Sequence, residues 1–417
     1  MKKTITNLID FLGKEILNQT WFFLSLLILV SFFLRIWHLG AIKEPIFDEV
    51  YFVAFAKNYL THVTFFDIHP PLGKLILACG IKIFGDNQFG QRIMPAIFGT
   101  ALIPLGYLAA KELMAKAKPN RAKIVGLFTA LILALDGLLL VYSRVGLMDI
   151  FLVFFIILSF DLFLKFANTQ KLLFLFLAGA AVGLTASVKY IGALLILIFL
   201  IIILIRKIPF LKNLLYFILF LGLVPAIIYL SFFLFNFSLN NQFLHEVLNW
   251  HKQSFNYNLT LTEGHPYASK WWGWFLLLRP IWLYFKDVNG RYIGVDGIGN
   301  PLLWWSAIVV LPLMIWGVVK RSKVNIIVLS SFLIFWLFWA FFSRVLFQYH
   351  AIPAFIFLTF GIAYWLERWL QIKFGNVYVT IYFLAALVIF IYFLPIWMGL
   401  PISSANFYHH IWLKGWI

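Results

Sequence analysis

Residues Trp21–Leu34 read WFFLSLLILVSFFL, an unbroken run without a charged side chain. An apolar run that approaches about 20 residues is long enough to cross the hydrocarbon core of a bilayer as a helix. Arg35 follows directly, with no small-residue cleavage pattern behind it. We therefore expect a retained membrane helix here and no cleaved signal peptide.

The composition of the whole chain agrees with this first helix. Hydrophobic residues make up 63% of the 417 residues and charged residues only 12%, whereas soluble globular proteins have about 25% charged residues. This excludes a soluble globular protein and predicts an all-α, polytopic membrane protein. The single cysteine, Cys79, excludes an internal disulfide.

Apolar runs of similar length recur along the chain, and we count about eleven candidate membrane spans. Neighbouring runs nearly touch within residues 121–206, so ten or twelve spans also fit the sequence. The candidate spans are 21–39, 92–113, 121–142, 147–165, 171–189, 190–206, 213–237, 302–319, 324–342, 345–366 and 376–399.

Basic residues gather at alternate ends of these spans, which is the pattern of cytoplasmic segments. We therefore expect a multi-pass plasma-membrane protein with a cytoplasmic N-terminus and an extracytoplasmic C-terminus. The net charge of +17 then reflects topology and contact with anionic membrane lipids, and it predicts no nucleic-acid partner. The basic residues that set the pattern are Lys2, Lys3, Lys14, Lys111, Lys116, Lys118, Arg121, Lys123, Lys165, Lys171, Arg206, Lys207, Lys212, Lys320, Arg321, Lys323, Arg368 and Lys373.

This topology leaves two long loops outside the membrane, over residues 40–91 and 238–301. They divide the chain into an N-terminal transmembrane module over 1–237, which includes the first outer loop, then the second outer loop, and then a C-terminal transmembrane module over 302–417. Both loops contain charged and aromatic residues that the spans largely lack.

The first outer loop contains two amphipathic stretches, 48–61 and 71–84, which we expect to form short interfacial helices. Asp48 and Glu49 open the first stretch, and on a helix their side chains diverge by about 100°, so one acid can act while its neighbour supports it. Asp67 lies on a turn that two following prolines stiffen. A solvated surface loop is the alternative interpretation of these acids.

Charged residues also occur at the outer ends of the predicted spans. A charge in the bilayer centre costs at least about 2.5 to 3.5 kcal/mol, so such residues usually face a cavity, a partner or a ligand, unless they extend to the interface. Cations beside carboxylates suit an anionic, lipid-linked headgroup, with an acid placed to remove a proton. These residues are Arg35, Arg92, Arg144, Asp149, Lys189 and Arg344.

Within this set we expect Arg144 and Asp149 to form a structural ion pair, while Asp136 and Asp161 have no assigned role. Histidines on the outer side would allow a divalent cation, Mg²⁺ or Mn²⁺, but their spacing predicts no metal held by the protein itself. His350 is a candidate phosphate contact, with a hydrogen-bonded core histidine as the alternative.

Two motifs of the first outer loop together indicate a family. Phe47-Asp48-Glu49-Val50-Tyr51-Phe52 and Phe66-Asp67-Ile68-His69-Pro70-Pro71-Leu72-Gly73-Lys74 closely resemble the corresponding loop of the dolichyl-phosphate-mannose protein O-mannosyltransferases, which are GT-C glycosyltransferases. Looser matches follow along most of the chain, at Tyr142–Asp149, Ala186–Gly192, His265–Pro280 and Arg344–Ala354.

The resemblance implies a GT-C fold with the active site under the first outer loop and an inverting transfer of mannose. The donor would be polyprenyl-phosphate-mannose, and the acceptor a serine or threonine hydroxyl of an exported protein. By position, Asp48 resembles the catalytic base and Glu49 its neighbour in positioning, while Asp67 and His69 shape the loop. The residues that the resemblance places around the donor phosphate are Arg35, Arg92, Lys189, Arg344 and His350.

The second outer loop lacks the β-trefoil insertion of the eukaryotic members, and in this the chain resembles bacterial members. Related GT-C enzymes with similar first loops, such as the aminoarabinose transferases, modify lipids, so a lipid or glycan acceptor stays open. A transporter or lipid flippase is the third alternative, because intramembrane charges suit it equally well. The halves 1–208 and 209–417 show no repeat symmetry that would favour a transporter.

Overall fold

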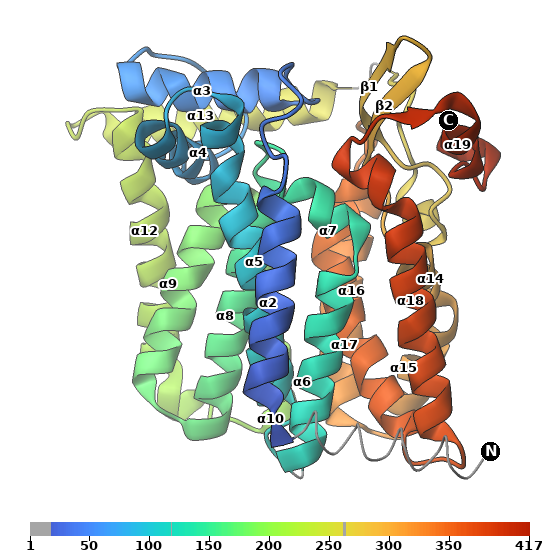
Figure 1. Cartoon of the computed structure of the whole chain (residues 1–417). Helices are drawn as coiled ribbons and strands as arrows, with labels where there is room; N and C mark the ends of the chain where they lie inside the picture. The colour runs from blue at the N-terminus through green and yellow to red at the C-terminus, as the bar shows by residue number, and fades with distance from the viewer. Residues whose placement is uncertain (1–17, 118, 262–263) are drawn as a thin grey trace.

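The computed structural model describes residues 18–117, 119–261 and 264–417. Lys2, Lys3, Lys14 and Lys118, which contribute to the predicted topology, lie outside the described residues. The described chain forms a bundle of roughly parallel and antiparallel helices with smaller elements across one end (Figure 1). The helices of the bundle are α2 (Thr20–Ile36), α5 (Gln88–Leu113), α6 (Pro119–Ala134), α8 (Asp149–Thr169), α9 (Leu172–Val188), α10 (Leu195–Arg206), α11 (Leu214–Phe217), α12 (Val224–Phe232), α15 (Ala307–Val319), α16 (Lys323–Leu337), α17 (Ile352–Trp369) and α18 (Gly375–Met398).

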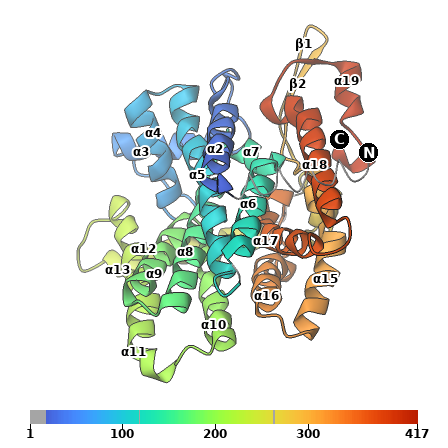
Figure 2. The same cartoon turned by 60° about the horizontal axis from the view of Figure 1, so that its bottom comes forward.

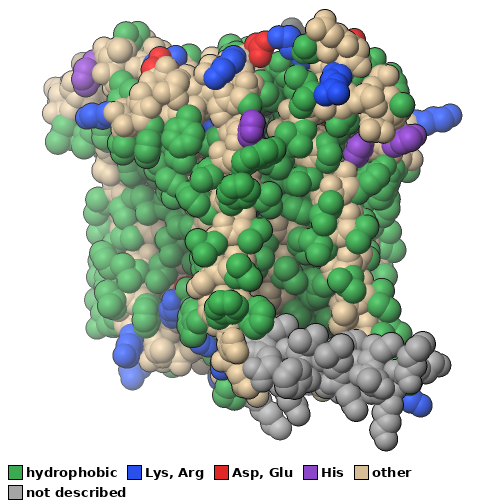
Figure 3. Space-filling model, viewed as in Figure 1, with side chains coloured by type: hydrophobic (Ala, Val, Ile, Leu, Met, Phe, Trp, Pro, Cys, Tyr) green, Lys and Arg blue, Asp and Glu red, His purple; other side chains and the backbone are tan. Residues whose placement is uncertain are grey.

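Seven helical segments of the described residues are long and apolar enough to cross a membrane. Three shorter apolar helices, over Thr20–Ile36, Leu172–Val188 and Tyr190–Arg206, accompany them. On the face seen in Figure 3, hydrophobic side chains cover the middle of the bundle, and charged side chains gather towards its two ends. The long segments are Gln88–Leu113, Asp149–Thr169, Leu211–Phe235, Pro301–Val319, Lys323–Phe341, Gln348–Trp369 and Gly375–Met398.

Helices from both halves of the chain share one hydrophobic core. The largest cluster of buried side chains extends from Ile46 to Trp416. Figure 2 shows α15–α18 on one side of the bundle and the first-half helices on the other, and α17 packs directly against α6 and α8. This common core joins the two parts of the chain. The division into two transmembrane modules stays a prediction.

The predicted span 121–142 is interrupted near its outer end. Helix α6 ends at Ala134, and the short helix α7 (Gly137–Tyr142) begins after Asp136, whose carboxylate accepts a hydrogen bond from the Leu139 amide at 2.9 Å. The same carboxylate accepts the Trp304 indole N–H at 2.8 Å and the Asn300 amide at 3.1 Å. Asp136, unassigned from the sequence, therefore caps α7 and ties it to α14 (Pro301–Trp305).

Three helices lie at the end of the bundle where the first outer loop is found. Helices α3 (Glu49–Thr61) and α4 (Leu72–Phe84) form over the two amphipathic stretches, and α13 (Phe243–Thr260) belongs to the second outer loop. Figure 1 shows α3 and α13 lying across the bundle axis at this end. Helix α4 packs against α3, α5 and α9.

The second outer loop also contains strands, so the expectation of an all-α chain is incomplete. Strands β1 (Trp282–Val288) and β2 (Arg291–Asp296) pair antiparallel, and β3 (Ile402–Ser403) adds to β2. Asn289 and Gly290 join β1 to β2 with φ of 53° and 77°. Two positive φ values are what a two-residue type I′ turn requires, and Asn-Gly is its preferred sequence.

Side-chain contacts attach the hairpin to the first outer loop. The ammonium of Lys286 on β1 pairs with the carboxylate of Glu44, and the Tyr284 hydroxyl donates to the same carboxylate at 3.1 Å. Beyond β3, a short helix, α19 (Ser404–His409), follows at the same end of the molecule.

Candidate active site

A cavity of about 570 Å³ lies under α13, between α8, the first turn after α9 and the segment before α17. Its polar wall includes Lys189, Arg344, Lys252 and Asp149, so formal positive charge exceeds negative charge. Aromatic and aliphatic side chains, among them Phe338, complete the lining. A cationic wall facing an apolar wall suits a ligand with an anionic head and a hydrocarbon tail.

Of the four cations expected at a phosphate, Lys189 and Arg344 line this cavity, whereas Arg35 and Arg92 do not. The Lys189 ammonium donates to Asp149 at 2.7 Å and lies 5.7 Å from the centre of the Tyr349 ring. The Arg344 guanidinium donates to the side-chain oxygen of Asn258 on α13. Lys189 makes one hydrogen bond, and Arg344 makes a second one, from its Nε to the Val345 carbonyl at 3.3 Å, so both keep N–H donors for a ligand.

Asp48 begins α3 and lies close to the charges of Lys189 and Asp149. Burial raises the pKa of the Asp48 carboxyl to about 6; Lys189 opposes this rise and Asp149 adds to it. A carboxylate with a pKa near 6 is a stronger base than an ordinary aspartate and is still largely ionised at neutral pH. Asp48 does not itself line the cavity, but it lies near two residues that do, Lys189 and Asp149.

Phe47 determines the direction in which the chain enters this site. Its φ of 51° lies in the left-handed region, where a bulky residue is an outlier. The Phe47 ring makes edge contacts with Phe347 and Tyr349, with ring centres 6.1 and 6.3 Å apart. Aromatic packing against the segment before α17 therefore holds the strained residue next to Asp48.

Glu49 is engaged in a different way from its neighbour. It is 2% exposed and accepts hydrogen bonds from Arg92 at 2.8 Å, from the Gly146 amide at 2.7 Å and from the Ile46 amide at 2.7 Å. These contacts fix α3 against α5 and the 143–148 turn. The supporting role expected of Glu49 stays a prediction, and these contacts are compatible with it.

Arg92 uses every N–H group on contacts within the protein. Its Nε and one terminal nitrogen bind Glu49 at 2.8 Å, and the remaining donors reach the carbonyl oxygens of Leu39, Ile42 and Glu44. A guanidinium has five N–H donors, and all five are used. Arg92 therefore has no free N–H group with which to bind the phosphate of the sugar donor, as its expected role would require.

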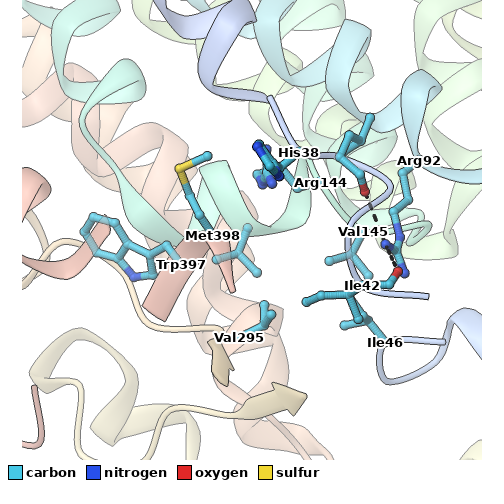
Figure 4. A pocket seen from close by; sticks show the side chains of 11 residues that line it. His38, Ile42, Ile46, Arg92, Arg144, Val145, Val295, Trp397 and Met398 are labelled. Atoms are coloured by element: carbon cyan, nitrogen blue, oxygen red, sulfur yellow. Dashed lines mark hydrogen bonds between the residues drawn. The ribbon is translucent and has the colours of Figure 1, made fainter. Parts of the chain in front are cut away.

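A second, much smaller cavity of about 20 Å³ lies beside Arg92 and Arg144 (Figure 4). It has room for a single water molecule. Arg144 donates to the carbonyl oxygens of Leu34 at 2.7 Å, Arg35 at 3.0 Å and Trp37 at 2.9 Å. A cation at the last carbonyls of a helix is stabilising, so Arg144 caps the C-terminal end of α2.

The predicted Arg144–Asp149 pair is therefore corrected, because Arg144 caps α2 and Asp149 pairs with Lys189. Arg35 also lies away from the large cavity. Its side chain is 1% exposed and donates to the Ser31 carbonyl at 3.1 Å, and its Nε has no hydrogen-bond partner among the described residues.

Asp67 and His69 lie on the loop between α3 and α4. Asp67 accepts a hydrogen bond from Lys74, a fully buried residue of α4 that the sequence analysis did not single out. The His69 ring lines the large cavity. Burial, followed by the charges of Lys189, Lys74 and Arg344, lowers the pKa of His69 well below its ordinary value, so the imidazole is neutral.

His350 lines the same cavity from the turn before α17, and its ring stacks on Tyr349 with centres 4.4 Å apart. Its Nδ1 lies 3.0 Å from the Phe347 carbonyl oxygen. Sequence reasoning missed Tyr349, Asn258 and Lys252, although the first lies inside a quoted motif. Among the described residues, no three His, Cys, Asp or Glu side chains come together as a metal-ligand group.

Comparison with known proteins gives a consistent picture over the whole chain. The model of the family described as dolichyl-phosphate-mannose-protein mannosyltransferase matches residues 25–87 and 81–241. The model of the C-terminal four-transmembrane region of protein O-mannosyltransferase matches residues 243–416. The two matches meet within the second outer loop.

Curated relatives match along nearly their full length. A polyprenol-phosphate-mannose–protein mannosyltransferase of Mycobacterium tuberculosis is 25% identical over 95% of this chain and 92% of the relative. One of Corynebacterium glutamicum is 28% identical over 96% of this chain and 93% of the relative.

Two solved structures share the fold. The Saccharomyces cerevisiae protein O-mannosyltransferase Pmt1–Pmt2 complex, bound to the sugar donor, aligns with a TM-score of 0.81 at 16% identity, covering 94% of this chain and 92% of the other. ArnT from Cupriavidus metallidurans aligns with a TM-score of 0.61 at 13% identity, covering 92% and 77%. At these identities the likeness is one of fold.

Proposed function

Because the chain belongs to the dolichyl-phosphate-mannose-protein mannosyltransferase family, we propose that it transfers mannose from polyprenyl-phosphate-mannose to serine or threonine hydroxyls of exported proteins. The observation that supports this most directly is Asp48, a base with a pKa of about 6, next to a cavity whose polar wall is cationic. These two features match the two demands of the reaction, a proton to remove and a phosphate to stabilise.

In the proposed reaction the donor phosphate lies against Lys189 and Arg344, and the first part of its prenyl chain lies along the apolar wall. Asp48 accepts the proton of the acceptor hydroxyl as the hydroxyl oxygen forms a bond to C1 of mannose. The bond between C1 and the phosphate oxygen breaks on the opposite face, which inverts the configuration. Polyprenyl phosphate leaves with the bonding electron pair, and the two cations stabilise its growing negative charge.

Supporting residues keep Asp48 in place during this reaction. Glu49 and Arg92 fix α3 beneath it, and Phe47 sets the entry of the chain. His350 remains a candidate for orienting the donor from the cavity wall, whereas Arg35 lies away from the cavity, which does not support the role expected of it. Asp67 and His69 belong to the loop that borders the same cavity.

For the whole molecule we propose eleven spans: the seven long segments, the three shorter helices and the α6–α7 pair. The N-terminus would be cytoplasmic, and the C-terminus and the active site would face the outside of the plasma membrane. The alternation of basic residues along the sequence supports this orientation.

The proposal is tested by incubating membranes that contain the protein with labelled polyprenyl-phosphate-mannose and separating the product into protein and lipid fractions. We expect label in the protein fraction, and Asp48→Asn should remove it while the variant still binds polyprenyl phosphate. Asp86→Asn, at an acid of the same loop that is half exposed, is the matched control and should retain transfer.

Label in the lipid fraction would replace the protein acceptor with a lipid one and keep the catalyst. Such a result would favour the lipid-modifying alternative. Absence of transfer by the unaltered protein, with several lipid-linked sugars, would overturn the enzyme reading and favour a transporter.

A further inference from the structure

Lys74 lies in the first turn of α4 and is completely buried. Burying an ammonium group is costly unless charge and hydrogen bonds compensate for the lost water. Lys74 has both, because its ammonium donates to the Asp67 carboxylate, to the His69 carbonyl at 2.5 Å and to the Pro70 carbonyl at 2.7 Å. An ammonium has three N–H donors, so all of them are directed to one loop.

The sequence of this loop explains why it needs an internal cation. Pro70 and Pro71 have no backbone N–H, so they give the loop no donors of their own at the point where the chain turns into α4. The Lys74 ammonium reaches back from the helix and satisfies two consecutive carbonyls. Asp67 neutralises its charge, which makes the arrangement tolerable in a buried place.

The loop is held from its other side as well. The Ile68 carbonyl accepts hydrogen bonds from the Tyr190 hydroxyl at 3.1 Å and from the Ser254 hydroxyl at 2.7 Å. Tyr190 follows Lys189 directly, and Ser254 belongs to α13, which covers the cavity. Three consecutive carbonyls, 68 to 70, are therefore bound by side chains from three separate elements.

The residue in the middle of these three carbonyls is His69. With the backbone fixed on both sides, its ring is directed into the large cavity, where it also contacts Phe52 of α3 with ring centres 5.9 Å apart. A neutral imidazole can donate one N–H to a phosphate oxygen. A backbone shift of about 1 Å would be enough to spoil such a contact, and misplacement of this size costs about 10²-fold in rate.

We propose that Lys74 is a positioning residue for the donor site: by binding the carbonyls of residues 69 and 70 it holds the His69 ring against the donor phosphate. The inference rests on the proposed function, since it takes the phosphate of a polyprenyl donor as the ligand of this cavity. Lys74 itself touches neither substrate, and its effect passes through His69.

The experiment measures both binding of polyprenyl phosphate and steady-state transfer for five proteins: the unaltered one, Lys74→Met, Lys74→Arg, His69→Ala and the Lys74→Met/His69→Ala double variant. Lys82→Met is the matched control, because Lys82 lies on the same helix but is exposed. Lys74→Met should weaken polyprenyl-phosphate binding and raise the donor KM by roughly 10- to 100-fold, with a smaller change in kcat. The control should match the unaltered protein.

The double variant provides the decisive comparison. If Lys74 acts through His69, the double variant should be no more than about twofold worse than His69→Ala, because coupled residues are non-additive. Losses that multiply in the double variant would overturn the proposal and leave Lys74 with a general structural role. Unchanged binding and KM in Lys74→Met would also overturn it.

Lys74→Arg keeps the charge, so it provides a second test of the proposal if Lys74→Met does not fold. A guanidinium cannot direct three donors from one nitrogen atom, so the loop should shift and the donor KM should rise. Unchanged kinetics of Lys74→Arg would overturn the proposal. Because binding is measured separately, an unaltered protein that binds polyprenyl phosphate without transferring mannose would refute the proposed function, and the variants would still decide on Lys74.

Discussion

Two adjacent acids of the first outer loop have opposite surroundings. Glu49 accepts hydrogen bonds from a guanidinium and two backbone amides, whereas Asp48 has a raised pKa and lies near the charges of Lys189 and Asp149. Hydrogen bonds of this kind hold a carboxylate in place, while burial without full compensation raises the pKa of a carboxyl group. The division of labour that the adjacent acids suggest therefore has a physical cause in the structure.

The raised pKa of Asp48 predicts that kcat/KM falls at low pH. As the proposed catalytic base, Asp48 must be deprotonated, so kcat/KM should be constant well above pH 6 and fall about tenfold per unit at lower pH. The midpoint should lie near pH 6, not near the ordinary value of an aspartate. Measuring kcat/KM of the mannosyl transfer from pH 4.5 to 8 in membranes checks this, and a midpoint near pH 4 would contradict it.

The Glu49–Arg92 pair predicts a large effect on stability. Both side chains are at most 2% exposed, and Glu49→Ala would leave a buried, uncompensated guanidinium. Loss of one partner from such a pair costs about 3 to 5 kcal/mol. Thermal unfolding in detergent should show a clear fall in midpoint. Asp86→Ala removes an exposed pair with Lys57 and should change stability by less than about 1 kcal/mol.

Two basic side chains that line the cavity predict that mannosyl transfer does not need a metal ion. Lys189 and Arg344 supply the positive charge that a divalent cation would otherwise provide at the phosphate. We therefore expect mannosyl transfer to persist in the presence of EDTA. Loss of transfer with EDTA, and its recovery with Mg²⁺ or Mn²⁺, would show that a cation accompanies the donor.

Among the secondary-structure elements, hydropathy patterns predict the helices better than the breaks within them. The amphipathic stretches 48–61 and 71–84 correspond to α3 and α4. The break between α6 and α7 does not follow from hydropathy, because the partners of Asp136 come from residues 300 and 304, far along the chain. The sequence analysis did not predict the hairpin, although the adjacent Asn289 and Gly290 favour a type I′ turn.

The hairpin turn predicts a strain effect at Gly290. No described atom lies within 4 Å of a Cβ placed there, so only the φ of +77° opposes a side chain. Gly290→Val should destabilise the hairpin by roughly 1 to 2 kcal/mol, as expected for a left-handed, β-branched residue. Hydrogen exchange of the β1 and β2 amides would report it. Gly264→Val, in open space without a positive φ, should leave exchange unchanged.

Over the whole molecule, the orientation can be tested with the protein's own single thiol. Cys79 lies on α4, is exposed, and belongs to the loop that we place outside. A membrane-impermeant maleimide should therefore label the protein in intact cells. A Cys79→Ser/Lys320→Cys variant should be labelled only after permeabilisation, because Lys320 lies in a predicted cytoplasmic loop. The opposite pattern would invert the topology.

The sequence predicts the membrane class and several of the charged and histidine residues of the cavity, because charges between apolar runs are conspicuous. Lys189, Arg344, His69 and His350 do meet at one cavity. The sequence does not predict which basic side chains use their N–H donors within the protein. Arg92, for example, binds backbone carbonyls that no sequence pattern reveals. Sequence reasoning also overlooks Lys74, which appears in sequence as one more basic residue near the interface.

High salt concentration should affect the strength of two kinds of ion pair around the first outer loop differently. Arg92–Glu49 and Lys74–Asp67 are shielded by protein, so dissolved ions cannot come between their charges. Lys286–Glu44, which attaches the hairpin to the loop, has both side chains about half exposed at 50% and 47%. High salt should therefore weaken the contact between the hairpin and the first outer loop, while the two buried pairs stay intact.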